Sequence, residues 1–244
     1  PRSACSPMTR DQLAPQALAA LRCDLEDCID GEVRFERFFR GMHSTDASVY
    51  QIVPLGVVAP RSRDDVVRAV ELCRQHGASI AARGGGTSQA GQAIGPGLIL
   101  DFSRHMNHLL ELDVAARTVR VEPGLVLDEL NARLKPHGLQ LPLDLSTANR
   151  ATIGGMIANN SAGTRSIVYG KTIDYVEELE VVLADGTLIT MPPLDDEALR
   201  EKCSRDDLEG DCYRVVRELG TEHQDEIRRR YPKILRRVGG YNLD

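Results

Sequence analysis

Apolar side chains recur at helical intervals near the start of the chain. Leu13, Leu18, Leu21 and Leu25 are spaced so that they share one face of a helix. Proline is tolerated in the first turn of a helix but not in its interior, so Pro15 predicts that the helix begins close to that residue. The pattern predicts an N-terminal helix that packs one face against a core.

Two further helices carry clear start and stop signals. Ser62 is a favourable N-cap followed by two aspartates, and Gly77 ends the pattern. The apolar side of this helix is expected to be Val66, Val67, Val70 and Leu72. Residues 127–135 predict the next helix, which ends at the Pro-His-Gly segment 136–138. Charged segments with a helical pattern fill residues 195–231.

Runs of β-branched and apolar residues predict the strands. Residues 50–60 contain Pro54 and Pro60 and are expected to form a strand pair or an edge strand. Residues 78–82 and 98–102 are expected to be short buried strands. Two hairpins are also predicted, and they pair residues 109–114 with 118–122 and residues 176–183 with 187–190.

Strands that alternate with helices, together with hairpins, predict an α+β fold with two subdomains. We expect a small βαβ-containing unit and a unit with a larger mixed sheet and flanking helices. The expected segments are an N-terminal helical segment, a first subdomain, a second subdomain and a closing helical segment, over residues 1–48, 49–105, 106–192 and 193–244.

Charge and hydropathy narrow the range of partners. The 244 residues include 30 Lys+Arg and 36 Asp+Glu, a net charge of −6 without a basic block, which argues against nucleic acid as a partner. No apolar run approaches the roughly 20 residues of a membrane span, and the first residues lack the plan of a signal peptide. We therefore expect a soluble, cytoplasmic protein. Because the chain starts at Pro1 and stops at Asp244, we also expect it to be part of a longer protein.

Cysteine and histidine spacing does not predict a metal site. The six cysteines are dispersed, without the two-residue gaps typical of zinc or iron–sulfur ligands, and are expected to be free thiols. His105 and His108 are three residues apart, but the predicted hairpin makes them surface or turn residues. No residue is assigned as a catalytic acid or base.

Residues 82–91 read ARGGGTSQAG and follow a predicted strand. Three consecutive glycines let backbone amides approach an anion closely, and a threonine and a serine add short donors. The segment matches neither the G-x-G-x-x-G dinucleotide pattern nor a P-loop, which requires a lysine. A phosphate site and a tight turn without a ligand both remain open on this segment alone.

A second segment, residues 152–163, reads TIGGMIANNSAG and carries no charge. Each glycine would weaken a helix by about 1 kcal/mol, so regular structure is disfavoured here. Close packing against an extended ligand explains the composition better than a surface loop, which would carry more lysine and glutamate. The two glycine-rich segments together predict a dinucleotide-sized anionic cofactor.

The ordered motifs resemble the FAD-binding domain of the vanillyl-alcohol oxidase/p-cresol methylhydroxylase superfamily. Beside the two glycine-rich segments, the motifs are LDFS at 100–103, VEPG at 121–124, NRATIGG at 149–155, YGKT at 169–172 and LEVVLADG at 179–186. Within the superfamily the chain is most similar to the D-lactate/glycolate/D-2-hydroxyglutarate dehydrogenase branch. It resembles the long bacterial members, in which a substrate domain and an iron–sulfur domain follow.

The resemblance implies a two-subdomain FAD-binding fold and a set of cofactor contacts. Backbone amides of the first segment would wrap the pyrophosphate, the second segment would line the cofactor, and two valines would lie at the adenine end. The residues implied are Arg83, Gly84, Gly85, Gly86, Thr87, Ser88, Gly91, Gly124, Asp144, Thr147, Thr152, Gly154, Gly155, Asn159, Ser161, Ala162, Gly163, Val181 and Val182.

The resemblance also implies that FAD is held without a covalent bond. Relatives that attach FAD through histidine place it where Thr87 stands, and this chain has no cysteine between residues 74 and 202. One departure is local: the branch usually reads Gly-Pro-Asp-Pro-Ser-Thr where residues 142–147 read PLDLST. The conformation of that loop is therefore an open point.

The function implied is oxidation of a D-2-hydroxy acid by hydride transfer to FAD. Electrons would leave to an iron–sulfur domain of the same polypeptide or to a separate acceptor, through which membrane association stays open. The alternatives are a FAD-binding module without turnover and an NADPH-using flavin reductase of the same superfamily. Arginines at 228–230, 236 and 237 either steer an anionic substrate or form a solvated face.

Overall fold

A four-stranded mixed sheet organises the first part of the computed structural model, which describes residues 13–234, 241 and 243. The strands run in the order β1-β2-β4-β3, with β1 antiparallel to β2 and the other three parallel. Their bounds are Glu32–Arg34 for β1, Gly56–Ala59 for β2, Ile80–Arg83 for β3 and Leu98–Asp101 for β4. The inner strands β2 and β4 are buried almost throughout, whereas the edge strand β3 is partly exposed.

Two of the predicted strands have different places in this sheet. Residues 50–60 do not form a strand pair or an edge strand: only β2 is a strand, and it pairs on both sides. Pro54 and Pro60 flank β2 and remove no donor from its ladder. Residues 78–82, predicted to be a buried strand, contribute to β3, which is the edge strand of this sheet among the described residues.

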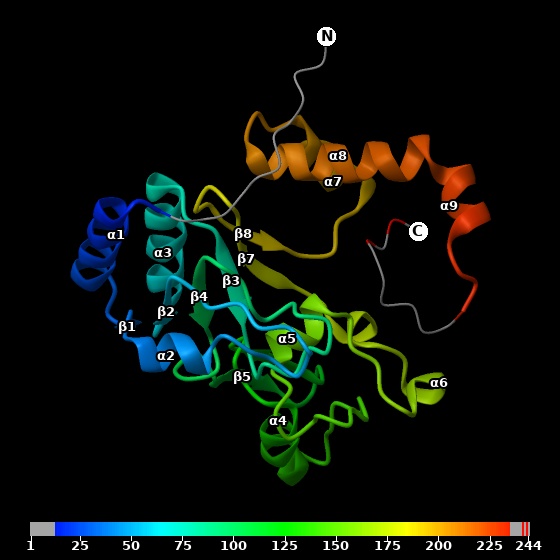
Figure 1. The fold of residues 1–244 in the computed structure, drawn as a ribbon. Helices are drawn as coiled ribbons and strands as arrows, with labels where there is room; N and C mark the ends of the chain where they lie inside the picture. The colour runs from blue at the N-terminus through cyan, green and yellow to red at the C-terminus, as the bar shows by residue number, and fades with distance from the viewer. Residues whose placement is uncertain (1–12, 235–240, 242, 244) are drawn as a thin grey trace.

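Helices α1 (Pro15–Cys28) and α3 (Arg63–His76) lie side by side against the sheet, as Figure 1 shows. The hydroxyl of Ser62 accepts a hydrogen bond from the Asp65 amide at 3.2 Å, and Gly77 ends α3 with φ 69°. Both helices are those that the sequence predicts. Their buried residues form one core cluster with those of the inner strands, including Leu21, Leu25, Val58, Ala69, Cys73 and Leu98.

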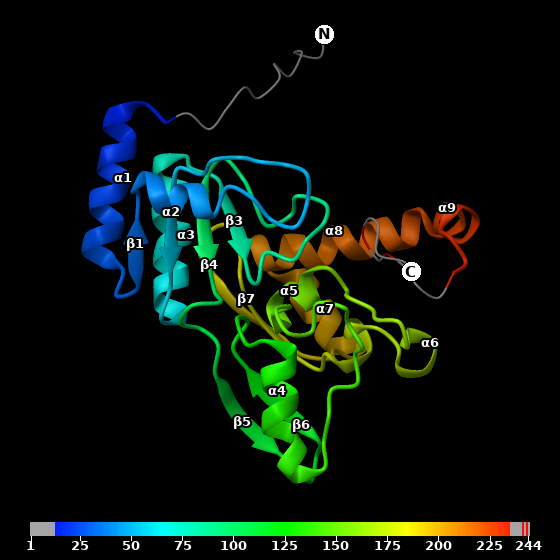
Figure 2. The same cartoon turned by 60° about the horizontal axis from the view of Figure 1, so that its bottom comes forward.

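The strands after residue 106 pair as two hairpins. They are β5 (Leu109–Asp113) with β6 (Thr118–Val121), and β7 (Leu179–Val182) with β8 (Leu188–Met191). Helix α4 (Leu127–Leu134) lies across the first hairpin in Figure 2, and the 3₁₀ turn η1 (Lys135–His137) ends it. The α+β class with a mixed sheet is confirmed, with that sheet placed in the first part of the chain and local hairpins in the second.

Several short helices surround these elements. α2 (Arg37–Met42), α6 (Ser166–Tyr169) and η2 (Thr172–Tyr175) carry no strong signal in the sequence. α5 (Ile153–Ala158) corrects the expectation that the glycines at 154 and 155 prevent regular structure. A Cβ at Gly154 would lie 2.7 Å from the Pro123 Cβ, so tertiary packing of this helix requires glycine despite its low propensity.

The charged C-terminal part is helical, as predicted. α7 (Asp196–Ser204) and α8 (Leu208–Glu222) pack together, and α9 (Gln224–Arg230) follows. Buried Glu209 is paired with Lys202 and Arg205, which ties the two helices at their connection. In the region the structure describes, no helix is both long and apolar enough to span a bilayer.

The described cysteines are all free thiols, and they are Cys23, Cys28, Cys73, Cys203 and Cys212. Burial in the core raises the pKa of the Cys73 thiol to about 12, so this thiol stays protonated at neutral pH. Cys5, Arg236 and Arg237 lie outside the described residues.

Candidate functional site

The first glycine-rich loop follows the carboxyl end of β3, and the backbone amides at its start are unpaired within the described residues. Among the described residues, the backbone amides from Gly84 to Gln89 donate no hydrogen bond. Gly86 and Gly91 have φ values of 64° and 75°, which side-chain-bearing residues adopt at a cost. Consecutive free amides on a left-handed turn form a concave site for an anion.

The side chain of Arg83 is committed to holding this loop. Its Nη1 donates to the carbonyl of Thr45 at 2.9 Å and to that of Ala93 at 3.1 Å. Burial lowers the pKa of Arg83, while the nearby carboxylates of Asp101 and Asp46 oppose that shift. The guanidinium therefore acts first as an anchor whose charge already has two acidic neighbours.

The two hydroxyl-bearing residues of this loop, Thr87 and Ser88, differ in their hydrogen bonding. Ser88 Oγ donates to Gln92 Oε1 at 2.8 Å and accepts from the Ala90 amide at 3.2 Å, so it stabilises the loop itself. Thr87 is partly buried, and within the described part of the chain its hydroxyl has no hydrogen-bond partner. The Thr87 hydroxyl is thus free to donate to a ligand.

The two glycine-rich segments pack directly on one another. A Cβ at Gly84 would overlap with the hydroxyl of Thr152, and one at Gly85 would overlap with the Arg150 carbonyl. Thr152 stands at the N-cap of α5, yet its hydroxyl makes no capping bond. It is 2% exposed, and its Oγ1 is a buried polar atom without a partner. An unpaired buried hydroxyl is costly, which marks this contact as a place for a ligand atom.

Three of the predicted glycines make room for the chain's own backbone. Gly124 meets the Phe102 carbonyl, Gly154 meets Pro123, and Gly163 meets the Asp144 carbonyl. The carboxylate of Asp144 pairs with Arg165 at 3.1 Å on the surface. In the segment with the departing sequence, Thr147 contributes its carbonyl, which accepts the amides of residues 150 and 151 at 2.8 and 2.7 Å.

The Asn-Asn pair divides into one exposed and one buried residue. Asn159, the predicted contact, is exposed, whereas Asn160 is 9% exposed with φ 43°. Asn160 Oδ1 accepts the Ile173 amide at 3.1 Å, and its Nδ2 is buried without a partner. The sequence reasoning missed Asn160, although asparagine is the residue that tolerates a left-handed backbone after a helix.

The remaining predicted residues lie in two places. Ser161 follows Asn160, and its carbonyl accepts both the amide and the hydroxyl of Thr172. Ala162 is buried beside it, and Gly155 lies in α5. Val181 and Val182 lie on β7, and Val182 packs against the core of the first sheet. The valines are therefore not among the residues that line the cavity described next.

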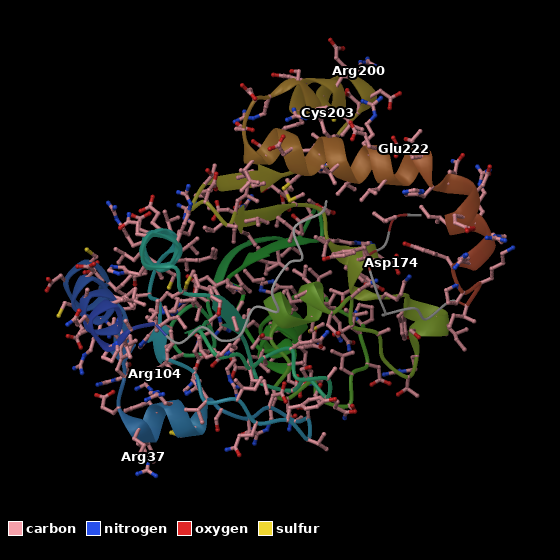
Figure 3. The ribbon with its side chains drawn as sticks, turned by 45° about the horizontal axis from the view of Figure 1, so that its top comes forward. Arg37, Arg104, Asp174, Arg200, Cys203 and Glu222 are labelled. Carbon is pink, nitrogen blue, oxygen red and sulfur yellow. The ribbon has the colours of Figure 1, made fainter. Side chains whose placement is uncertain are left out.

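A cavity of about 330 Å³ opens beside the start of the first glycine-rich loop and residues 149–150, which precede the second segment. Its lining consists of Met42, His43, Arg83, Gly84, Gly85, Asp101, Ser103, Val126, Asn149 and Arg150. A larger hollow of about 730 Å³ lies on the outer side of α2, but its lining is largely apolar and Arg37 points outward there, as Figure 3 shows. The polar groups identify the smaller cavity as the candidate site.

His43 and Asp101 form a pair in this cavity that the sequence did not predict. His43 Nε2 lies 3.1 Å from Asp101 Oδ2, and its Nδ1 lies 2.9 Å from the Phe39 carbonyl. Burial opposes ionisation of Asp101, but hydrogen bonds from His43 and Ser103 outweigh it and leave the pKa of Asp101 lowered. Asp101 therefore remains a carboxylate beside the glycine loop.

The described residues do not include a set of side chains placed to bind a metal ion. Across the described residues, no group of three or more His, Cys, Asp or Glu side chains is placed to hold a metal ion. His105 pairs with Glu32 at 3.0 Å and His108 pairs with Glu122 at 2.6 Å, in two separate ion pairs. The site as described offers backbone and side-chain donors for an anion.

Comparison with protein families gives a match over residues 54–192 to a model described as "FAD binding domain". A D-2-hydroxyglutarate dehydrogenase of Pseudomonas putida is 41% identical over 232 residues, which are 94% of this chain and 23% of that protein. A glycolate oxidase subunit of Bacillus subtilis is 41% identical over 153 residues, 62% of this chain and 32% of the subunit. The chain thus spans less than a third of the length of either relative.

Solved structures show the same fold. A 4-ethylphenol oxidase of Gulosibacter chungangensis matches with a TM-score of 0.63 and 20% identity, over 74% of this chain and 36% of the oxidase. A p-cresol methylhydroxylase matches with a TM-score of 0.64 and 19% identity, over 73% of this chain and 36% of that one. These likenesses confirm the α+β fold with a mixed sheet, and the division into two subdomains stays a prediction.

Proposed function

Because the chain belongs to the family of FAD binding domains, in the branch of D-2-hydroxyglutarate, glycolate and D-lactate dehydrogenases, we propose that it is the FAD-binding part of a flavin-dependent D-2-hydroxy acid dehydrogenase. The observation that carries the proposal is the run of unpaired amides at Gly84–Gln89, which lies within the residues that match the FAD binding domain. The substrate class is supported by the names of the relatives.

The residues present fit an anionic dinucleotide. The free amides and the left-handed turn at Gly86 suit a pyrophosphate, which accepts hydrogen bonds and carries charge. The unpartnered Thr152 hydroxyl and Asn160 amide are buried donors that a cofactor's polar atoms would satisfy. We assign pyrophosphate binding to residues 84–88 and further cofactor contacts to Thr152, Asn160 and the segment 161–163.

The cofactor is expected to be held without a covalent bond. His43 is the histidine among the cavity-lining residues, and both of its ring nitrogens already face oxygen partners. No cysteine is among those residues. Acid precipitation of the flavin-loaded protein should release all of the yellow colour, and flavin that stays in the pellet would contradict a noncovalent mode.

The chain's own contribution is to bind and orient the cofactor and to shield it from water. When bound, FAD would supply the hydride acceptor, which is chemistry that belongs to the cofactor. Groups that bind the 2-hydroxy acid are assigned to the part of the relatives that this chain does not span. Electrons are proposed to pass to an iron–sulfur domain or a separate acceptor. The protein is proposed to be cytoplasmic and to associate with a membrane where that acceptor is membrane-bound.

The first test is a visible spectrum of the purified chain with added FAD. Flavin absorption bands that remain after gel filtration are expected, and a chain that binds no FAD would contradict the assignment. The second test uses the full-length protein and a panel of D-2-hydroxy acids without oxygen. Bleaching by a D-2-hydroxy acid is expected, whereas bleaching by NADPH alone would identify a reductase, and no bleaching would leave a binding module.

A further inference from the structure

A short segment before β2 is fastened across the glycine loop at several points. We call residues 43–50 the strap. The Ala47 amide donates to the Gly86 carbonyl at 3.1 Å, and Asp46 Oδ2 accepts the Ala93 amide at 3.4 Å. At the two ends of the strap, His43 pairs with Asp101, and the Tyr50 ring lies where a Cβ on Gly91 would be 2.9 Å away.

These contacts spare the amides that the site needs. A glycine-rich loop loses more conformational entropy on ordering than other segments, so it needs ties to stay in one shape. Among the described residues, the backbone amides from residue 84 to residue 89 donate no hydrogen bond that could order the loop. The strap instead uses the Gly86 carbonyl and the Ala93 amide, which lies beyond the free run. The loop is thereby ordered while its donors stay open.

Arg83 connects the strap with the far side of the loop. Its guanidinium bonds to the Thr45 carbonyl in the strap and to the Ala93 carbonyl after the loop. It also passes beneath Gly86, where a Cβ would lie 2.5 Å from Nη2. Asp46 is a charged neighbour of Arg83 and also holds the Ser48 amide at 2.9 Å.

We infer that Asp46 and Arg83 are positioning residues, which hold the glycine loop in the shape that receives the pyrophosphate through backbone amides, rather than charges that set its affinity. This inference rests on the proposed binding of FAD. The alternative, in which Arg83 attracts the anion by its charge, makes the opposite prediction for Asp46. On charge alone, removing a carboxylate near an anion site strengthens anion binding.

The substitution Asp46→Asn separates the two explanations. Asparagine keeps the shape and one acceptor, but its amide group faces one of the two amides that the carboxylate now holds, so one tie breaks. We expect a FAD dissociation constant about tenfold higher, the size of one lost hydrogen bond to a charged group. Arg83→Lys keeps the positive charge, but its side chain is shorter and its ammonium does not reach the position from which Nη1 bonds both carbonyls, so we expect it to weaken binding similarly. Val49→Ser is the matched control, because Val49 lies in the strap and is 95% exposed.

The measurement is a titration of each apoprotein with FAD, followed by flavin fluorescence, with circular dichroism melting of the apoproteins. The wild type and the control should bind alike and the two variants more weakly. If Asp46→Asn binds FAD as tightly as the wild type or more tightly, the inference is wrong. If Asp46→Asn does not fold, Arg83→Lys decides, because wild-type affinity in that variant would also overturn it. A wild type that binds no FAD would instead refute the proposed function.

Discussion

Glycine has a different role in each of the two glycine-rich segments. In the first loop, Gly86 and Gly91 supply left-handed turns, and the amides of residues 84–89 stay free. In the second segment, Gly154 and Gly163 have ordinary backbone angles and make room for other parts of the chain. The first loop is thus kept open by ties from outside, whereas the second is closed by packing. Loss of a tie to the first loop should therefore weaken ligand binding, whereas filling the space at Gly154 or Gly163 should lower stability.

The largest effect is expected for Gly163→Ala. The new Cβ would overlap with the Asp144 carbonyl, a backbone atom that cannot move aside cheaply. We expect the free energy of unfolding to fall by about 3 kcal/mol, measured by urea denaturation. Gly41→Ala is the control, because Gly41 lies in the short helix α2 with nothing within 4 Å of a Cβ there. That variant should gain up to about 1 kcal/mol. Equal stability of the two variants would contradict the packing role assigned to Gly163.

Next in size is the effect of Thr152→Val, which removes the unpaired buried hydroxyl and keeps the shape. The apoprotein should gain about 1 kcal/mol, because the cost of burying an unsatisfied group disappears. FAD affinity should fall by about tenfold, because a donor for the cofactor is lost. Thr87→Val makes the same change in the first glycine-rich loop, and its free energy of unfolding should stay within about 0.5 kcal/mol of the wild-type value. Urea denaturation and FAD titration measure both quantities, and a destabilised Thr152→Val would show that the hydroxyl has a partner.

The elements with local signals could be predicted from the sequence, and those that depend on distant partners could not. Ser62 and Gly77 bound α3 where their capping chemistry indicates, and the two hairpins close over short turns. β1 is a three-residue strand with two charged side chains, and it exists because β2 pairs with it. Helix α5 forms against the propensity of its glycines, because packing on Pro123 outweighs a local cost.

The candidate site divides in the same way. Both glycine-rich segments could be found by composition, because free amides and close approaches require glycine whatever the surroundings. His43 and Asp101 are 58 residues apart, and nothing in either local sequence indicates that they meet. Asn160 was adjacent to a predicted contact, but which asparagine of the pair is buried depends on how α5 ends. Side-chain partners across the fold are thus the part that required the structure.

A smaller effect on stability is expected from the protonation of Asp101, which lines the cavity beside the first glycine-rich loop. The pKa of Asp101 is lowered in the folded state by hydrogen bonds that outweigh burial, so the unfolded state binds more protons in acid. The stability that Asp101 contributes is complete above its ordinary pKa of 3.8 and is lost as the pH falls through the lowered value. Unfolding free energy should therefore drop by up to about 1 kcal/mol more in the wild type than in Asp101→Asn between about pH 5 and about pH 3. Parallel pH profiles of the two proteins in urea denaturation would contradict this assignment.

The smallest effect tests whether charge contributes to closing the second segment. Arg165 and Asp144 form an ion pair at 3.1 Å, but their side chains are 60% and 42% exposed. Water and salt screen such pairs, so Arg165→Gln should change the free energy of unfolding by less than about 0.5 kcal/mol. The comparison is sharp because Gly163→Ala acts on the carbonyl of the same Asp144 whose carboxylate loses its partner here. A loss in Arg165→Gln as large as that in Gly163→Ala, and reduced by added salt, would show that charge rather than backbone packing closes the segment.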